Sequence, residues 1–168
     1  MSRWKRLCLV VLMILACTGC DQATKAMAKQ FLPKNQIVSL LKDTIRLHYV
    51  HNSGAFLGLG ASMPRLARTA VFTLGVGVVV VGIFIYLLTV SALRMETLVG
   101  LSLICGGGFG NLIDRVAYQG EVVDFLNVGI GSLRTGIFNI ADVAVLVGAL
   151  VILWERARAR RNVDSSLS

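Results

Sequence analysis

Residues 69–90 read TAVFTLGVGVVVVGIFIYLLTV and contain no charged side chain. At a rise of about 1.5 Å per residue, a helix of this length would cross the hydrocarbon core of a bilayer. The rest of the chain has the same character, because 55% of its 168 residues are hydrophobic and only 15% are charged. A soluble domain typically has about 25% charged residues. The sequence therefore predicts a protein that spans a membrane.

Three further apolar runs suggest four spans in total, within one membrane-embedded domain that covers 1–168. The predicted spans are 7–28, 69–90, 97–113 and 136–154. An even number of spans places both termini on one side of the membrane. The terminal side carries its lysines and arginines in short, strongly basic flanks, which favours the cytoplasm. We therefore expect cytoplasmic termini, with 155–168 as a basic tail.

The polar region between the first two spans predicts a small β element at about 36–60. Within it, TIRLHYV (44–50) alternates apolar Ile45, Leu47 and Tyr49 with polar residues. This period of two is typical of a half-buried strand. We expect the element to lie outside the membrane.

The net charge of +8 does not indicate a nucleic-acid partner. The basic residues flank apolar runs, and no aromatic and basic surface pattern accompanies them. The pair Cys17 and Cys20 also lacks the second Cys or His pair of a zinc site. We expect neither nucleic-acid binding nor metal binding.

Polar residues gather at span ends that face the same side. They are Asp21, Gln22 and Lys25 in the first span, Asn111, Asp114 and Arg115 in the third, and Asn139 and Asp142 in the fourth. Because successive spans run in opposite directions, these ends all lie at the outer face. The loop regions that carry Asn52 and Asp124 are expected there too. The sequence therefore predicts one polar site near the outer membrane surface.

Asp124 and Asp142 have no adjacent basic residue in the sequence. An ionised carboxyl in hydrocarbon is unfavourable by at least about 2.5 kcal/mol, so a specific role must offset the cost. Two carboxyls brought close in a site of low dielectric share one proton, as in aspartic proteases. The residues alone leave three interpretations open: an aspartic dyad, a proton or ion relay, and structural hydrogen bonding.

Four motifs carry a resemblance to a known family. They are DQATK (21–25), NSGAF (52–56), GNLIDRVAYQGEVVDF (110–125) and FNIADVAVLVG (138–148). With these motifs the sequence resembles lipoprotein signal peptidase, also called signal peptidase II, a family of bacterial intramembrane aspartic proteases. The last two motifs are highly specific when they occur together.

The resemblance implies an α-helical membrane protein of four spans with an outer β-cradle and a short amphipathic helix. It also implies a location in the bacterial inner membrane and removal of the signal peptide from diacylglyceryl-modified prolipoproteins, by cleavage before the lipidated cysteine. The partners would be these substrates and membrane phospholipid. No metal, no organic cofactor and no obligatory protein partner are expected.

The resemblance further assigns roles to residues of the four motifs. Asp124 and Asp142 would form the catalytic dyad. A second group would bind substrate or orient the dyad, namely Asn52, Gly54, Asn111, Arg115 and Asn139. A third group would give structural polar support, namely Asp21, Gln22, Lys25 and Asp114.

The sequence departs from the family pattern at two places. The second motif usually reads N-x-G-A-A-F, but here Phe56 follows a single Ala55, and LRTGI (133–137) replaces the usual aromatic and proline residues before the fourth motif.

Two other classes of protein share features of this sequence. LACTGC (15–20) is similar to a lipobox, which would make the chain a lipoprotein, but Cys17 stands where leucine is usual. A small transporter or proton-conducting protein would also use buried acids, although distributed through the membrane rather than clustered at one face.

Overall fold

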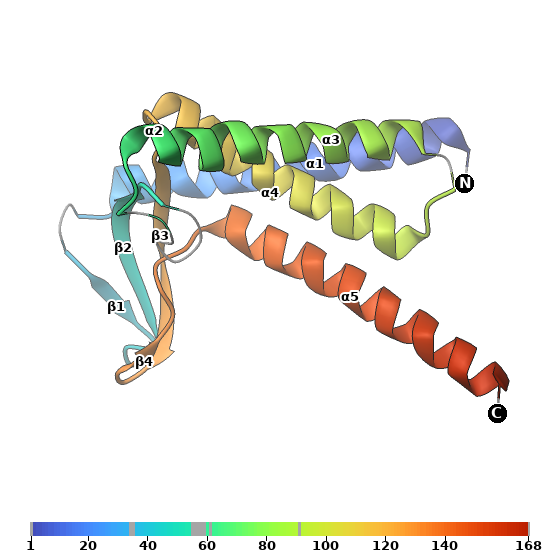
Figure 1. Ribbon diagram of the computed structural model, residues 1–168. Coiled ribbons are helices and arrows are strands. Elements are labelled where there is room, and N and C mark those ends of the chain that lie inside the picture. The colour runs from blue at the N-terminus through green and yellow to red at the C-terminus, as the bar shows by residue number, and fades with distance from the viewer. Residues whose placement is uncertain (1, 34–35, 55–59, 61, 91, 168) are drawn as a thin grey trace.

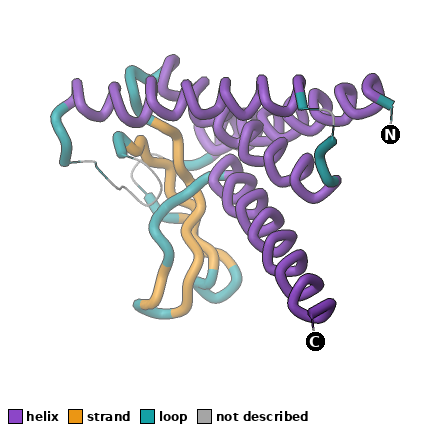
Figure 2. The backbone as a smooth tube through the Cα atoms, turned by 45° about the vertical axis from the view of Figure 1, so that its right-hand side comes forward, coloured by secondary structure: helices purple, strands orange, loops and turns teal. Residues whose placement is uncertain are grey.

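The computed structural model describes residues 2–33, 36–54, 60, 62–90 and 92–167, and of 163–167 the backbone alone. Its helices are α1 (Arg3–Phe31), α2 (Arg65–Arg68), the π-helix η2 (Thr69–Gly75), α3 (Val76–Thr89), α4 (Met95–Ala117) and α5 (Ile140–Leu167). Its strands are β1 (Val38–Leu40), β2 (Ile45–Asn52), β3 (Val122–Ile130) and β4 (Leu133–Arg134). Figures 1 and 2 show the sheet at the end of the helices that lies away from the N-terminus.

Helix α4 packs against α1, α3 and α5. Its glycines allow this close approach, because a Cβ atom on Gly107 would collide with the carbonyl oxygen of Ala141, and one on Gly108 with the side chain of Val80. Small residues permit such packing in a membrane, where lipid offers no hydrophobic drive between helices. Leu87, Leu98 and Cys105 are buried in the apolar core around α4.

Three helical segments of the described chain are long and apolar enough to cross a membrane, namely α1, Arg65–Thr89 and α4. Helix α5 is as long, but Asp142 and Glu155 bound an uncharged stretch of only 12 residues. A typical span has about 20 consecutive apolar residues. The prediction of a helical membrane protein is confirmed, whereas the fourth span at 136–154 stays a prediction.

The four strands form one antiparallel sheet in the order β1-β2-β3-β4. The alternating residues 45–49 do lie in a strand, β2, as predicted. Strand β3 was not predicted, and Asp124 lies within it instead of in a loop. The first four residues of β3 are all buried, so this strand lacks the alternation that marks a half-exposed one.

The structure describes the loop LRTGI (133–137), but it shows no short amphipathic helix among the described residues before α2. The loop LRTGI contains β4, whose Leu133 pairs with Ile130, and it leads to a bridge between Phe138 and Leu126. The described residues between 32 and 64 form strands and turns but no helix. Phe56 lies outside the described residues, and the short amphipathic helix stays a prediction.

Candidate active site

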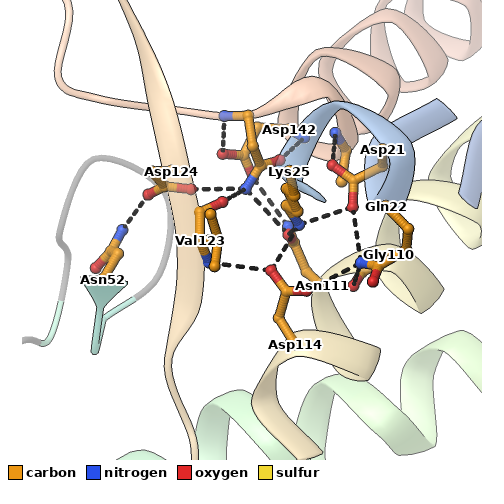
Figure 3. A network of polar contacts seen from close by, with 12 residues as sticks. Asp21, Gln22, Lys25, Asn52, Gly110, Asn111, Asp114, Val123, Asp124 and Asp142 are labelled. Carbon is orange, nitrogen blue, oxygen red and sulfur yellow. Dashed lines mark hydrogen bonds and ion pairs between the residues drawn. The ribbon is translucent and has the colours of Figure 1, made fainter. Parts of the chain in front are cut away.

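Asp124 and Asp142, both labelled in Figure 3, each accept a hydrogen bond from the same residue, Asn139. The side-chain nitrogen of Asn139 donates to Oδ1 of Asp124 over 2.6 Å. The backbone nitrogen of Asn139 donates to Oδ2 of Asp142 over 3.3 Å. The structure therefore brings the two predicted acids, one from β3 and one from α5, to opposite sides of a single asparagine.

Asn139 is placed by its position directly before α5. Its Oδ1 accepts a hydrogen bond from the backbone nitrogen of Asp142 over 2.9 Å, while Asp142 accepts one from the backbone of Asn139. This reciprocal pattern is a capping box, with aspartate in the place of the more common glutamate. The partial positive charge at a helix N-terminus also favours a carboxylate there. The local sequence N-I-A-D thus fixes one acid and its partner together.

Asp124 is buried, with 2% of its surface exposed. Burial raises the pKa of Asp124 to about 6, and the charge of Asp142 adds to the increase, while the hydrogen bonds from Asn52 and Asn139 oppose it. Asn52 donates to Oδ2 of Asp124 over 2.9 Å and accepts from the backbone of Gly54 over 2.9 Å. Asp124 can therefore gain or lose a proton near neutral pH.

Asn111 of α4 holds Asp142 from the other side. Its side-chain nitrogen donates to Oδ1 of Asp142 over 3.0 Å. Its side-chain oxygen accepts from Lys25 over 2.9 Å and from Asn139 over 3.1 Å. Two donors at the oxygen fix the orientation of the amide, because the nitrogen must then point toward the carboxylate.

Lys25 is the centre of a buried charge network. Its Nζ lies 2.7 Å from Oδ2 of Asp21 and 2.9 Å from Oδ2 of Asp114. Gln22 donates to Oδ1 of Asp114 over 2.9 Å. Buried charges need such partners, since an unpaired one is strongly unfavourable. The sequence predicted that these residues lie at the same face, but not that Lys25 contacts Asp114.

This network also reaches the two elements that carry Asp124 and Asp142. Asp21 accepts from the backbone nitrogen of Ala141, at the start of α5, over 2.9 Å. Asp114 accepts from the backbone nitrogen of Val123, next to Asp124, over 3.0 Å. The four residues expected to give polar support thus connect α1 and α4 to both acids (Figure 3).

Arg115 is buried and binds backbone. Its two terminal nitrogens donate to the carbonyl oxygens of Gly120 and Gly54, each over 2.7 Å. Arg115 therefore holds the segment after Asn52 against the turn that precedes β3. Gly54 takes part through its backbone.

Three contributors escaped the sequence analysis. Val123 and Ala141 supply backbone N–H groups, which leave no mark in the sequence. Gly110 begins the third motif, and its carbonyl accepts a hydrogen bond from Gln22 over 3.1 Å. A Cβ atom on Gly110 would lie 2.6 Å from Oδ2 of Asp21, so the motif needs glycine here.

Chemically, the arrangement holds one buried carboxyl, that of Asp124, and one half-buried carboxyl, that of Asp142, with amide donors on both. Within the described residues, no cluster of three or more His, Cys, Asp or Glu side chains is arranged to hold a metal ion. The groups present can hold and transfer protons, and they can orient a polar substrate.

Comparison with known proteins identifies the family of the chain. Residues 13–158 match the family model described as signal peptidase (SPase) II. The lipoprotein signal peptidase of Moorella thermoacetica is 36% identical over 150 residues, which cover 88% of this chain and 89% of that protein. The lipoprotein signal peptidase of Syntrophus aciditrophicus is 35% identical over 145 residues, covering 84% and 88%. The lipoprotein signal peptidase of Burkholderia mallei is 33% identical over 163 residues, covering 96% and 92%.

A solved structure shares the fold. It is described as a bacterial membrane enzyme, and it superposes with a TM-score of 0.79 at 23% identity over 92% of this chain and 90% of that one. The family model covers most of the chain, and the relatives match across nearly their whole length. The chain therefore belongs to the signal peptidase II family, whose members are membrane proteases that process signal peptides.

Proposed function

We propose that this protein removes the signal peptide from diacylglyceryl-modified prolipoproteins by cleaving the peptide bond before the lipidated cysteine. Asp124 and Asp142 act as an aspartic dyad, and one water molecule is the nucleophile. The observation that carries the proposal is the bridging of both carboxyls by Asn139 at the junction of β3 and α5.

In the proposed reaction the dyad shares one proton. The ionised carboxylate removes a proton from the water while its oxygen attacks the carbonyl carbon of the scissile bond. The neutral carboxyl donates its proton to the carbonyl oxygen. When the tetrahedral intermediate collapses, the C–N bond breaks and the departing nitrogen takes up the proton that the first carboxylate removed from the water. The second carboxyl recovers its proton from a hydroxyl of the intermediate, so the dyad again holds one proton. The products are a signal peptide with a new carboxyl terminus and a lipidated cysteine with a free amine.

The surrounding amides support this chemistry. Asn52 and Asn139 donate to Asp124, and Asn111 donates to Asp142. Donors held by a rigid network need little rearrangement as charge moves between the carboxyls, which lowers the barrier. The raised pKa of Asp124, to about 6, is consistent with a carboxyl that exchanges a proton more readily near physiological pH than an ordinary aspartate does.

The proposed substrate approaches from the extracytoplasmic side. Four spans, with α5 as the fourth, would place both termini in the cytoplasm and the dyad near the outer face of the inner membrane. Arg115 then acts with Gly54 and Asn52 to hold the substrate-facing segment beside Asp124. In this topology the basic end of α5, residues 155–167, lies on the cytoplasmic side as part of the same single domain.

The experiment is a cleavage assay with purified full-length protein in detergent. A diacylglyceryl-modified precursor is compared with the same precursor without the lipid, and product masses locate the cut. We expect cleavage before the cysteine in the lipidated precursor and much slower cleavage of the unmodified one. Cleavage at another bond, or equal rates for both precursors, would overturn the substrate assignment.

A further inference from the structure

A polar pocket lies between α2 and the turn that follows α4. Figure 1 shows these two elements at the same end of the helix bundle. The volume of the pocket is about 440 Å³. Its lining includes the following charged and polar side chains: His51, Arg65, Arg68, Tyr118, Gln119 and Glu121. Neither aspartate of the dyad lines it, so it is a site apart from the proposed reaction centre.

The charge of this pocket favours an anion. Two guanidinium groups line it against one carboxylate, that of Glu121. Glu121 already has a neighbour, since its Oε2 lies 3.4 Å from Nδ1 of His51. Among the described residues, Arg65 donates a hydrogen bond to Gln119 over 3.3 Å, and a guanidinium has five N–H donors in total. Arginine is the side chain whose planar donors best match phosphate oxygens.

The position of the two arginines along the chain indicates the source of the phosphate. Arg68 directly precedes a long uncharged run, and the next charged residue is Arg94. Arg65 and Arg68 therefore lie where the hydrocarbon region ends, which is the depth of lipid headgroups. Phospholipid headgroups are present at high local concentration at that depth, which favours a phospholipid over a soluble phosphate as the ligand.

Apolar surface for acyl chains lies next to the pocket on both helices. Leu66, beside Arg65, is 84% exposed, and Val116, beside Ala117 of the pocket wall, is 80% exposed. Side chains of this kind are stable on a surface that faces lipid. A headgroup in the pocket would direct its chains along these residues.

The turn that forms one wall is held rigidly. Gly120 donates its backbone N–H to the carbonyl of Arg115 over 2.7 Å, and Arg115 donates back to the carbonyl of Gly120. Gln119 and Gly120 both adopt positive φ, at 55° and 100°. A wall that is already ordered loses little freedom when a ligand binds.

We propose that this pocket binds the phosphate of a membrane phospholipid, with Arg65 and Arg68 as its ligands and with Leu66 and Val116 in contact with the acyl chains. The diacylglyceryl group of the proposed substrate contains no phosphate, so it lacks the group that the two arginines would bind. The inference therefore stands whether or not the proposed cleavage is correct. A lipid held here would join the start of α2 to the turn before β3.

The test is native mass spectrometry of the delipidated full-length protein in detergent, titrated with a short-chain phosphatidylglycerol. Parallel titrations use the matching diacylglycerol, which lacks phosphate, and inorganic phosphate as a competitor. The variant is Arg65→Gln with Arg68→Gln. The matched control is Arg160→Gln with Arg161→Gln, which removes the same charge from exposed positions near the other end of the chain.

We expect one phosphatidylglycerol to bind the wild type and the control variant, and the affinity of the Arg65/Arg68 variant to fall by about tenfold or more, as expected for loss of charge-assisted contacts. Phosphatidylglycerol should also raise the unfolding temperature of the wild type but not of that variant. The unfolding temperature measured without lipid shows whether the Arg65/Arg68 variant is folded. If the double variant is not folded, Arg65→Gln and Arg68→Gln are each tested alone. Equal lipid binding by wild type and Arg65/Arg68 variants, equal binding of diacylglycerol, or full displacement by inorganic phosphate at comparable concentration would each overturn the proposal.

Discussion

Lys25 donates a hydrogen bond from its ammonium group to the side-chain oxygen of Asn111 over 2.9 Å. This contact decides which way the amide of Asn111 faces, and its nitrogen consequently points to Asp142 at 3.0 Å. A charge in α1 thereby orients a donor in α4 that holds an acid in α5. The relationship connects the stability of the helix bundle to the geometry of the proposed dyad.

Replacing Lys25 with methionine should destabilise the protein by about 3–5 kcal/mol, because Asp21 and Asp114 would be left buried without their cation. Chemical unfolding in detergent measures the change. Lys29→Met is the matched control, since Lys29 lies one turn further along α1 and is exposed. If both variants unfold like the wild type, Lys25 does not hold the network.

Gly110→Ala should destabilise the protein by about 1–3 kcal/mol, the usual cost of overpacking, because its Cβ atom would approach Oδ2 of Asp21 to 2.6 Å. Gly77→Ala is the control, since Gly77 lies in α3 with nothing within 4 Å of an added Cβ. That substitution should be neutral or stabilising by up to about 1 kcal/mol, as for glycine in any open helix. Gly110→Ala should therefore lower the unfolding temperature, and Gly77→Ala should leave it unchanged or raise it. An equal decrease in both variants would contradict the close contact.

The pH dependence of stability should report the raised pKa of Asp124. Its pKa rises from 3.8 to about 6 on folding, so between these values the folded protein binds more protons than the unfolded one. This contribution is fully present below pH 3.8 and is lost as the pH rises through about 6. The wild type should therefore lose stability relative to Asp124→Asn over that interval, with a slope of at most about 1.4 kcal/mol per pH unit. If the difference in free energy of unfolding between the two proteins does not vary with pH, the pKa of Asp124 is not raised by folding.

Reporter fusions test the proposed topology. A reporter that is active only in the cytoplasm should work when fused after Ser168, and one that is active only outside should work when inserted at Lys42, in the turn between β1 and β2. This result requires α5 to cross the membrane although its uncharged stretch is short. Finding both sites on the same side would remove the fourth span, and the reverse arrangement would place the dyad on the wrong side for exported precursors.

The sequence predicted the helices well because their apolar runs are long, as in residues 69–90. It predicted β2 because Ile45, Leu47 and Tyr49 alternate with polar residues. It missed β3, since Val122, Val123 and Phe125 flank Asp124 without alternation and all four are buried. Both faces of such a strand are covered by partners that are distant in sequence, which a local pattern cannot reveal.

The candidate site shows the same division. The sequence placed Asn139 and Asp142 together near the outer end of the fourth predicted span, and the structure joins them in a capping box at the start of α5. The motifs named Lys25, but nothing in the sequence connects Lys25 to Asn111, since 86 positions separate them. Arg115 was expected near substrate or dyad, and it proves to bind the carbonyls of Gly54 and Gly120. Contacts to backbone atoms carry no side-chain signature.

The central claim is that Asp124 and Asp142 together activate the water that cleaves the lipidated precursor. The most direct measurement is the single-turnover cleavage rate of Asp124→Asn and Asp142→Asn, each shown to be folded by its thermal unfolding. Asp43→Asn serves as the control, because Asp43 is a half-exposed acid in the turn between β1 and β2, paired with Arg46 and away from the proposed dyad. We predict that each dyad variant loses at least about 100-fold in rate, as expected for loss of a general acid or base, while the control keeps the wild-type rate. A folded Asp124→Asn or Asp142→Asn protein that cleaves as fast as the wild type would contradict the account.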